Sequence, residues 1–170
     1  MFNTKVLTYS GIGIALAVVL NQLAVFSFPN GGAITLGSMF FITILGYWFG
    51  VKVGVIAGVS MGLINLALGG FVFAPVQVLL DYPLAFGMLG LSGLFKSLHV
   101  GYIVAVVGRF VMHTISGVVF FYMFAPEEQN VWVFSMVYNA SYIAPEMLLT
   151  VGLISVPAFR KALDRIKGEM

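Results

Sequence analysis

Residues 100–124 read VGYIVAVVGRFVMHTISGVVFFYMF, an apolar run interrupted by one arginine and one histidine. A helix needs about 20 apolar residues to cross a bilayer, so this segment predicts a membrane-spanning helix. Ionisable groups at membrane depth cost roughly 3 kcal/mol even on mild scales, and such groups face protein or water rather than lipid. Arg109 and His113 therefore indicate a polar pocket inside a membrane protein.

The composition of the whole chain agrees with a membrane location. Of its 170 residues 61% are hydrophobic and 8% are charged, and the mean hydropathy is +1.07. Soluble domains carry about 25% charged residues, so the soluble class is excluded. The absence of cysteine excludes disulfides and thiolate metal sites. The net charge of +2 comes from loops and does not indicate a nucleic-acid partner.

We predict an all-α membrane protein, a six-transmembrane-helix bundle in which residues 1–170 form a single integral membrane domain. Turn signals lie at residues 28–32 (FPNGG) and at Gly69-Gly70. The first apolar run is too long for a signal peptide, so we expect it to remain as a span. The predicted spans are Val6–Val25, Ala33–Phe49, Val51–Leu68, Ala74–Phe95, Val100–Phe124 and Val131–Pro157.

The basic residues predict how this bundle is oriented in the cell membrane. In a six-span arrangement every loop lysine and arginine falls on one side, and the opposite loops carry Glu127 and Glu128. Because Lys and Arg concentrate on the cytoplasmic side, both termini are predicted to be cytoplasmic and residues 158–170 to form a basic cytoplasmic tail. The basic residues concerned are Lys5, Lys52, Lys96, Arg160, Lys161, Arg165 and Lys167.

Small residues recur at helical spacing in two places. Glycines at positions 46, 50, 54, 58 and 62 are four residues apart, which favours close helix packing inside the bundle. Gly11, Ala15 and Val19 form a similar stripe on the first span. Because that span is terminal, its stripe indicates contact with an external membrane partner.

Ionisable and polar residues in three spans are predicted to converge. From the rise of about 1.5 Å per residue, Asp81, His113 and Asn139 lie at similar depths in the outer half of the bundle. Two helix faces carry the remaining polar groups, one with Arg109, His113 and Gly117 and the other with Asn139, Tyr142 and Glu146.

Charge pairing within this group predicts what the pocket binds. Arg109 and Glu146 are expected to form a structural ion pair, which leaves Asp81 without a basic partner. Pro83 and Pro145 each remove a backbone hydrogen bond, so kinks are expected beside both carboxylates. A single uncompensated negative charge among many Tyr and Phe residues favours a flat aromatic cation as the ligand.

Several motifs together resemble one family, the thiamine-binding substrate-capture (S) subunits of energy-coupling factor (ECF) transporters, of the ThiT/YuaJ type. The resemblance covers nearly the whole chain in the right order. The motifs are GGAITLGSM at 31–39, PVQVLLDYPLAF at 75–86, Gly108-Arg109-Phe110 with His113 and Ser116-Gly117, Tyr122 with Ala125-Pro126, and Tyr138-Asn139 with Tyr142 and Pro145-Glu146.

The resemblance implies a six-helix membrane protein that captures thiamine from outside and is not itself an enzyme. It further implies docking onto a membrane scaffold subunit that two ATPase subunits drive, with no cofactor or metal. The stripe Gly11, Ala15 and Val19 matches the family's scaffold-docking motif, with Val19 in place of the usual second Ala. The chain contains no Gly-rich phosphate loop, so it does not supply ATP energy itself.

The resemblance also assigns the ligand contacts. It places Asp81 and Tyr82, His113 and Gly117, the aromatic Phe121 and Asn139 against the ligand, and Tyr138 and Tyr142 extend this set on the last span. Some members carry a Trp in the first external loop, where this chain has Phe26 and Phe28, and Phe134 stands where a Tyr hydroxyl can occur.

Two other functions compete with this interpretation. One is a capture subunit for another flat vitamin, of the riboflavin or pyridoxine type, which would share the fold but would not need the charge of Asp81. The other is an intramembrane hydrolase that uses Glu146 and His113. Metal-dependent hydrolases of that kind need further ligands converging on one ion.

Overall fold

The computed structural model describes residues 3–28, 32–126 and 128–170, and most of these residues are helical. The predicted turn at Pro29, Asn30 and Gly31 therefore lies outside the described residues, as does Glu127. The flanks of that turn are described and pair as a short antiparallel hairpin, with β1 (Phe26–Ser27) against β2 (Ala33–Ile34).

The first half of the chain forms helices α1 (Thr4–Gln22), α2 (Ser38–Phe49) and α3 (Val51–Ala67). Asn3 caps α1 through its side chain, which accepts from the backbone N–H of Val6 at 2.8 Å. Helices α2 and α3 meet at Gly50, whose φ of 90° suits glycine. The two predicted spans thus form a helical hairpin with a one-residue corner.

The predicted fourth span is a sequence of four short helical segments. They are α4 (Pro75–Leu79), the π-helical η1 (Leu80–Leu84), α5 (Ala85–Gly87) and the 3₁₀-helical η2 (Met88–Leu94). Pro83 lies inside η1, where it has no N–H to offer Leu79, and Ala85 N–H reaches back five residues to the carbonyl of Leu80. The irregular turn expected beside Asp81 is therefore present, as a π-turn.

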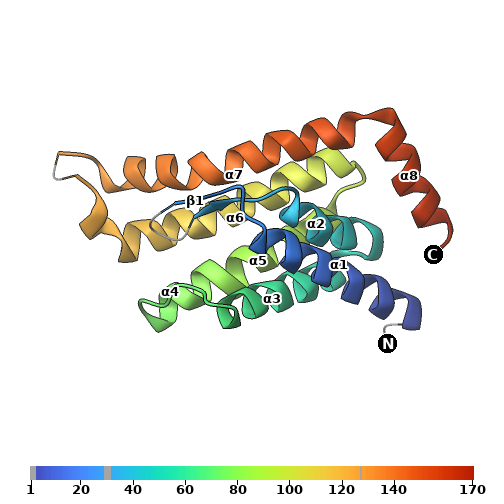
Figure 1. The fold of residues 1–170 in the computed structure, drawn as a ribbon, viewed down its shortest axis with the longest axis horizontal. Coiled ribbons are helices and arrows are strands. Elements are labelled where there is room, and N and C mark those ends of the chain that lie inside the picture. Colours follow the sequence, from blue (N-terminus) through green and yellow to red (C-terminus); the bar gives the residue numbers. More distant parts are fainter. Residues whose placement is uncertain (1–2, 29–31, 127) are drawn as a thin grey trace.

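The second half of the chain contains two long helices, α6 (Leu98–Phe120) and α7 (Val131–Ser155), which lie side by side in Figure 1. The short η3 (Tyr122–Phe124) follows α6. Helix α7 continues through Pro145 as one α-helix, so the helix is not interrupted there, and the kink expected beside Glu146 stays a prediction. A proline removes one intrahelical hydrogen bond, and here the turns on both sides hold the helix together.

The last helix, α8 (Pro157–Gly168), contains most of the predicted basic tail and bends by 79° from α7. Leu163 is buried and the Phe159 ring packs 5.5 Å from that of Phe40, between centroids. The two chain ends lie at the same end of the bundle, where Lys5 Nζ donates to the Met170 carbonyl at 2.9 Å (Figure 1). Helix α8 therefore packs against the bundle.

Three helical segments among the described residues are long and apolar enough to cross a membrane: Thr4–Gln22, Pro75–Leu94 and Leu98–Phe120. Helices α7 and α8 satisfy the same criteria only as a bent pair, and α2 and α3 are apolar but shorter. The expectation of an all-α membrane protein is confirmed.

The four short segments from α4 to η2 (Pro75–Leu94) are called the irregular helix here. The glycines of α3 allow its backbone to contact this irregular helix directly, as the spacing predicted. A Cβ at Gly54 would lie 2.7 Å from the Cα of Gly90, and one at Gly62 would lie 2.5 Å from the carbonyl oxygen of Tyr82. A Cβ at Gly58 would overlap the backbone of Phe86. Close backbone contact of this kind stabilises helix pairs in lipid.

We predict that Gly58→Ala destabilises the protein, because the new methyl group meets rigid backbone. The expected loss is about 1–3 kcal/mol, which corresponds to a fall of about 2–10 °C in melting temperature. The matched control is Gly152→Ala on α7, where a Cβ has nothing within 4 Å. Thermal unfolding of the detergent-purified variants should show a drop for Gly58→Ala alone, and equal melting temperatures would contradict the packing argument.

Candidate functional site

A cavity of about 690 Å³ opens between α1, the β1–β2 hairpin, α3, the irregular helix, α6 and α7. This volume falls within the range of about 300–1,000 Å³ that is typical of small-molecule sites. All eight ligand contacts expected from the sequence line it: Asp81, Tyr82, His113, Gly117, Phe121, Tyr138, Asn139 and Tyr142. The tertiary structure therefore brings the expected residues to one cavity.

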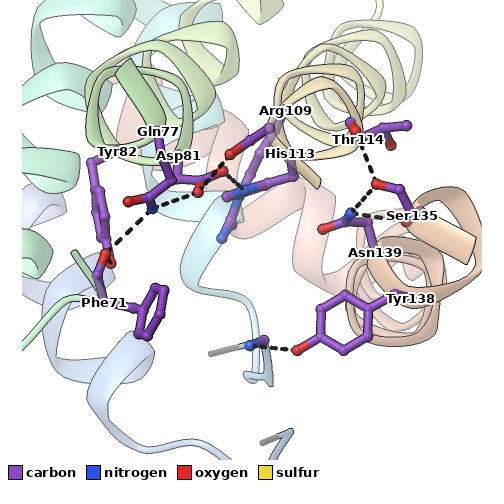
Figure 2. A network of polar contacts seen from close by, with 12 residues as sticks. Phe71, Gln77, Asp81, Tyr82, Arg109, His113, Thr114, Ser135, Tyr138 and Asn139 are labelled. Carbon is purple, nitrogen blue, oxygen red and sulfur yellow. Dashed lines mark hydrogen bonds and ion pairs between the residues drawn. The ribbon is translucent and has the colours of Figure 1, made fainter. Parts of the chain in front are cut away.

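Asp81 is held by three polar side chains (Figure 2). Its Oδ2 accepts from Gln77 Nε2 at 2.7 Å and from Ser116 Oγ at 2.8 Å, and its Oδ1 lies 3.0 Å from His113 Nδ1. Asp81 therefore has a histidine partner that the sequence analysis did not assign to it, and no Lys or Arg among the described residues forms an ion pair with it. Helix α6 faces η1 closely enough for both Ser116 and His113 to reach the carboxylate.

Gln77 connects Asp81 to the segment before α4. Its Nε2 also lies 3.3 Å from the carbonyl oxygen of Phe71, and its Oε1 accepts from Phe73 N–H at 2.9 Å. The hydroxyl of Tyr82 donates to the same Phe71 carbonyl at 3.2 Å (Figure 2). These bonds place an aromatic segment beside the carboxylate. Gln77 is four residues before Asp81, a spacing that could have identified it from the sequence.

The expected ion pair between Arg109 and Glu146 does not form. The structure describes both residues, and each of them contacts different partners. Arg109 Nε donates to His113 Nε2 at 3.2 Å, and its Cζ lies 4.2 Å from the centroid of the Phe86 ring. The Arg109 side chain follows its own helix by one turn to His113. This i to i+4 contact replaces the interhelical pair that the sequence suggested.

Glu146 holds the beginning of α2. Its Oε1 accepts from Met39 N–H at 3.0 Å and from Ser38 Oγ at 3.2 Å, and its Oε2 accepts from the hydroxyl of Thr35. The first N–H groups of a helix lack internal partners and attract negative charge. Glu146 is buried and does not line the cavity, so its role is structural.

Helix α7 contributes a second polar group to the cavity. Asn139 Nδ2 donates to the Ser135 carbonyl at 2.9 Å, and its Oδ1 accepts from Tyr142 OH at 2.5 Å. Gly117 lets α6 approach this region, because a Cβ there would overlap Ser135 Oγ. A side chain at position 117 would thus collide with Ser135, while the Gly117 backbone lines the cavity.

Aromatic rings surround the cavity on two sides. The Phe121 ring lies 5.8 Å from that of Phe71 and 6.1 Å from that of Phe73. On the hairpin side, the Phe28 ring lies 5.9 Å from that of Tyr138, whose hydroxyl accepts from Gly32 N–H at 3.2 Å. Tyr138 thus connects the hairpin to α7.

Asn65 is a cavity residue that the sequence analysis missed. It is 7% exposed, and neither polar atom of its amide has a hydrogen-bond partner among the described residues. An unpaired buried amide costs about 1–3 kcal/mol, which a polar ligand could recover. The sequence contained an indication of this role, because Asn65 is a polar residue inside an apolar predicted span.

The geometry does not favour a hydrolase. Glu146 and His113 have separate partners, and within the described ranges no three His, Asp or Glu residues are grouped to hold a metal.

The stripe Gly11, Ala15 and Val19 lies away from the cavity on an exposed face of α1, while Gly13 and Ala17 face the bundle.

Comparison with known proteins identifies the family. The family described as thiamine transporter protein (Thia_YuaJ) matches residues 7–165. Thiamine transporter ThiT of Bacillus subtilis (strain 168) is 37% identical over 155 residues, which cover 79% of this chain and 80% of that protein. Thiamine transporter ThiT of Lacticaseibacillus paracasei is 33% identical over 121 residues, covering 59% of this chain and 60% of that protein.

A solved structure of ThiT from Listeria monocytogenes shares the fold, with a TM-score of 0.79 at 23% sequence identity. The match covers 88% of this chain and 91% of that one. The sequence matches are to transport proteins and not to enzymes, and they confirm the family that the motifs resembled. This chain, a multi-pass integral protein of the cell membrane, belongs to the Thia_YuaJ family of thiamine transporter proteins.

Proposed function

We propose that this protein captures extracellular thiamine in the cavity beside Asp81 and passes it inward as the substrate-binding subunit of an ECF-type transporter. The single observation that carries the proposal is the Asp81 carboxylate on the cavity wall, with aromatic rings around it. Thiamine combines a permanent positive charge with two flat rings. Both features match what the cavity offers.

The charge of Asp81 is the main element of recognition. Among the described cavity residues Asp81 contributes −1 and Arg109 contributes +1, and Glu146 lies outside the lining. The attraction for a cation is therefore local to the carboxylate and does not come from a net negative cavity. Neutral donors from Gln77 and Ser116 stabilise the ionised carboxylate without cancelling its charge.

Aromatic and polar side chains supply the remaining contacts. Phe121 offers a ring face for stacking, and a cation–π contact contributes about 2 kcal/mol where water is excluded. Phe28 on the hairpin takes the place of the loop Trp found in some family members. Asn139 and Asn65 provide amide groups for the polar edges of a heteroaromatic ring, and Asn65 has both amide atoms unpaired.

The membrane arrangement follows the same proposal. The chain spans the membrane six times as one domain with both termini cytoplasmic, α2 and α3 serving as two short spans and α8 as the basic tail. The exposed stripe Gly11, Ala15 and Val19 docks on a membrane scaffold subunit, which works with two ATPase subunits. Support comes from the exposure of the stripe and from the open space beside Gly11, where a Cβ would meet nothing within 4 Å.

Calorimetric titration of detergent-purified protein tests the ligand. We expect saturable binding of thiamine at a one-to-one ratio, with no competition from riboflavin or pyridoxine, since both are electroneutral. Displacement of thiamine by either vitamin would favour the alternative ligand class. No binding of thiamine by folded protein would contradict the proposal.

We predict that Asp81→Asn lowers the affinity for thiamine by about 10–100-fold, because a charge-assisted contact of about 1.5–3 kcal/mol is lost. A neutral analogue, with carbon in place of the quaternary nitrogen, should bind wild type and Asp81→Asn almost equally. The control is Glu128→Gln, which removes an exposed acid from an outer loop. Equal losses for thiamine and the analogue would show that Asp81 does not recognise charge.

We predict that Ala15→Leu leaves thiamine affinity unchanged but reduces thiamine uptake by cells at least tenfold, because the added bulk separates α1 from the scaffold. The control is Gly152→Leu, a similar enlargement at an open position on α7. Both variants should bind thiamine normally in detergent. Normal uptake by Ala15→Leu cells would mean that this stripe is not the docking surface.

A further inference from the structure

His113 is placed between a cation and an anion, one at each ring nitrogen (Figure 2). Arg109 Nε lies 3.2 Å from His113 Nε2, and Asp81 Oδ1 lies 3.0 Å from His113 Nδ1. The third charged or titratable side chain beside it is Tyr142 on α7, with its ring centroid 6.3 Å from that of His113.

The chemistry of these partners determines where the imidazole proton sits. A guanidinium only donates hydrogen bonds and stays protonated in proteins, so Nε2 must offer its lone pair to Arg109. A neutral imidazole carries one N–H, which therefore lies on Nδ1 and donates to Asp81 Oδ1. A doubly protonated ring would direct an N–H at the N–H of Arg109.

We propose that Arg109 is a positioning residue that keeps His113 neutral, with its proton on Nδ1. Burial disfavours a charged imidazole and Arg109 adds a direct obstacle at Nε2, whereas the Asp81 carboxylate favours a second proton. Without Arg109, the carboxylate would draw that second proton to the ring, and His113 would form an ion pair with Asp81. That ion pair would cancel the negative charge that faces the cavity. Arg109 thus prevents Asp81 from being neutralised inside the protein. The consequence for ligand binding rests on the proposed function, in which the ligand is a cation.

The surroundings of Arg109 hold it in this position. Arg109 is 8% exposed, and its guanidinium stacks on the Phe86 ring of α5 with Cζ 4.2 Å from the centroid. It follows that His113 offers no free ring nitrogen to a ligand. His113 contacts the ligand through ring carbon atoms, and Asp81 makes the polar contact.

Nitrogen-15 NMR of histidine-labelled protein tests the protonation state without any ligand. The chain has two histidines, so His99→Gln assigns the signals. At about pH 6, below the ordinary histidine pKa of about 6.5, wild-type His113 should show one protonated and one bare nitrogen, with the proton on Nδ1. In Arg109→Met both nitrogens should be protonated.

The matched control is Ser116→Ala, which removes another donor to Asp81 and keeps Arg109. Its His113 should remain neutral at about pH 6, below the ordinary histidine pKa. A proton on Nε2 of the wild-type ring, or two protons, overturns the proposal even if Arg109→Met fails to fold. An unchanged spectrum in folded Arg109→Met overturns it as well.

The pH dependence of the affinity for thiamine is a second test, because a loss of packing alone would not make the affinity depend on pH. The affinity of Arg109→Met should be about tenfold lower at pH 6 than at pH 8, because the His113 charge that neutralises Asp81 is present only at the lower pH. Wild type should vary less than threefold. A pH-independent loss in Arg109→Met would make Arg109 merely structural, whereas a failure of thiamine to bind wild type would leave the NMR result intact.

Discussion

The need to satisfy a partly buried carboxylate at membrane depth organises this protein. No water is available inside a bilayer, so each polar group must find partners within the protein. Asp81 finds them on its own helix in Gln77 and on α6 in Ser116 and His113. Asp81 itself lies in the π-turn that contains Pro83. Together its three partners keep an ionised group at the cavity wall without exposing it to lipid.

Two close helix contacts determine where the cavity lies. Glycines of α3 bring that helix against the backbone of the segment that carries Asp81. On the other side, Gly117 lets α6 approach α7 until Ser135 Oγ donates to the Thr114 carbonyl at 2.9 Å. The cavity is the space left between these two tightly packed pairs. Larger side chains at either contact would move a cavity wall as well as lower stability.

Helix α7 also controls the hairpin side of the cavity. Glu146 holds the start of α2, and Tyr138 accepts a hydrogen bond from Gly32 at the end of the hairpin loop. The hairpin carrying Phe28 is therefore attached to the helix that presents Asn139 and Tyr142. A movement of α7 would be transmitted to the hairpin through these two attachments, one of which is charge-assisted.

The sequence by itself determined the membrane class, the helical fold, the family and eight of the residues that line the cavity. These features follow from hydropathy, helical periodicity and local motifs, which depend on residues near one another in the chain. Only the tertiary structure decided the partners of the charges. Glu146 pairs with the start of α2 more than 100 residues away, and Arg109 is thereby left for His113. Opposite charges at similar depth suggest an ion pair, but the rotation of each helix decides which groups meet, and that depends on packing across the whole bundle.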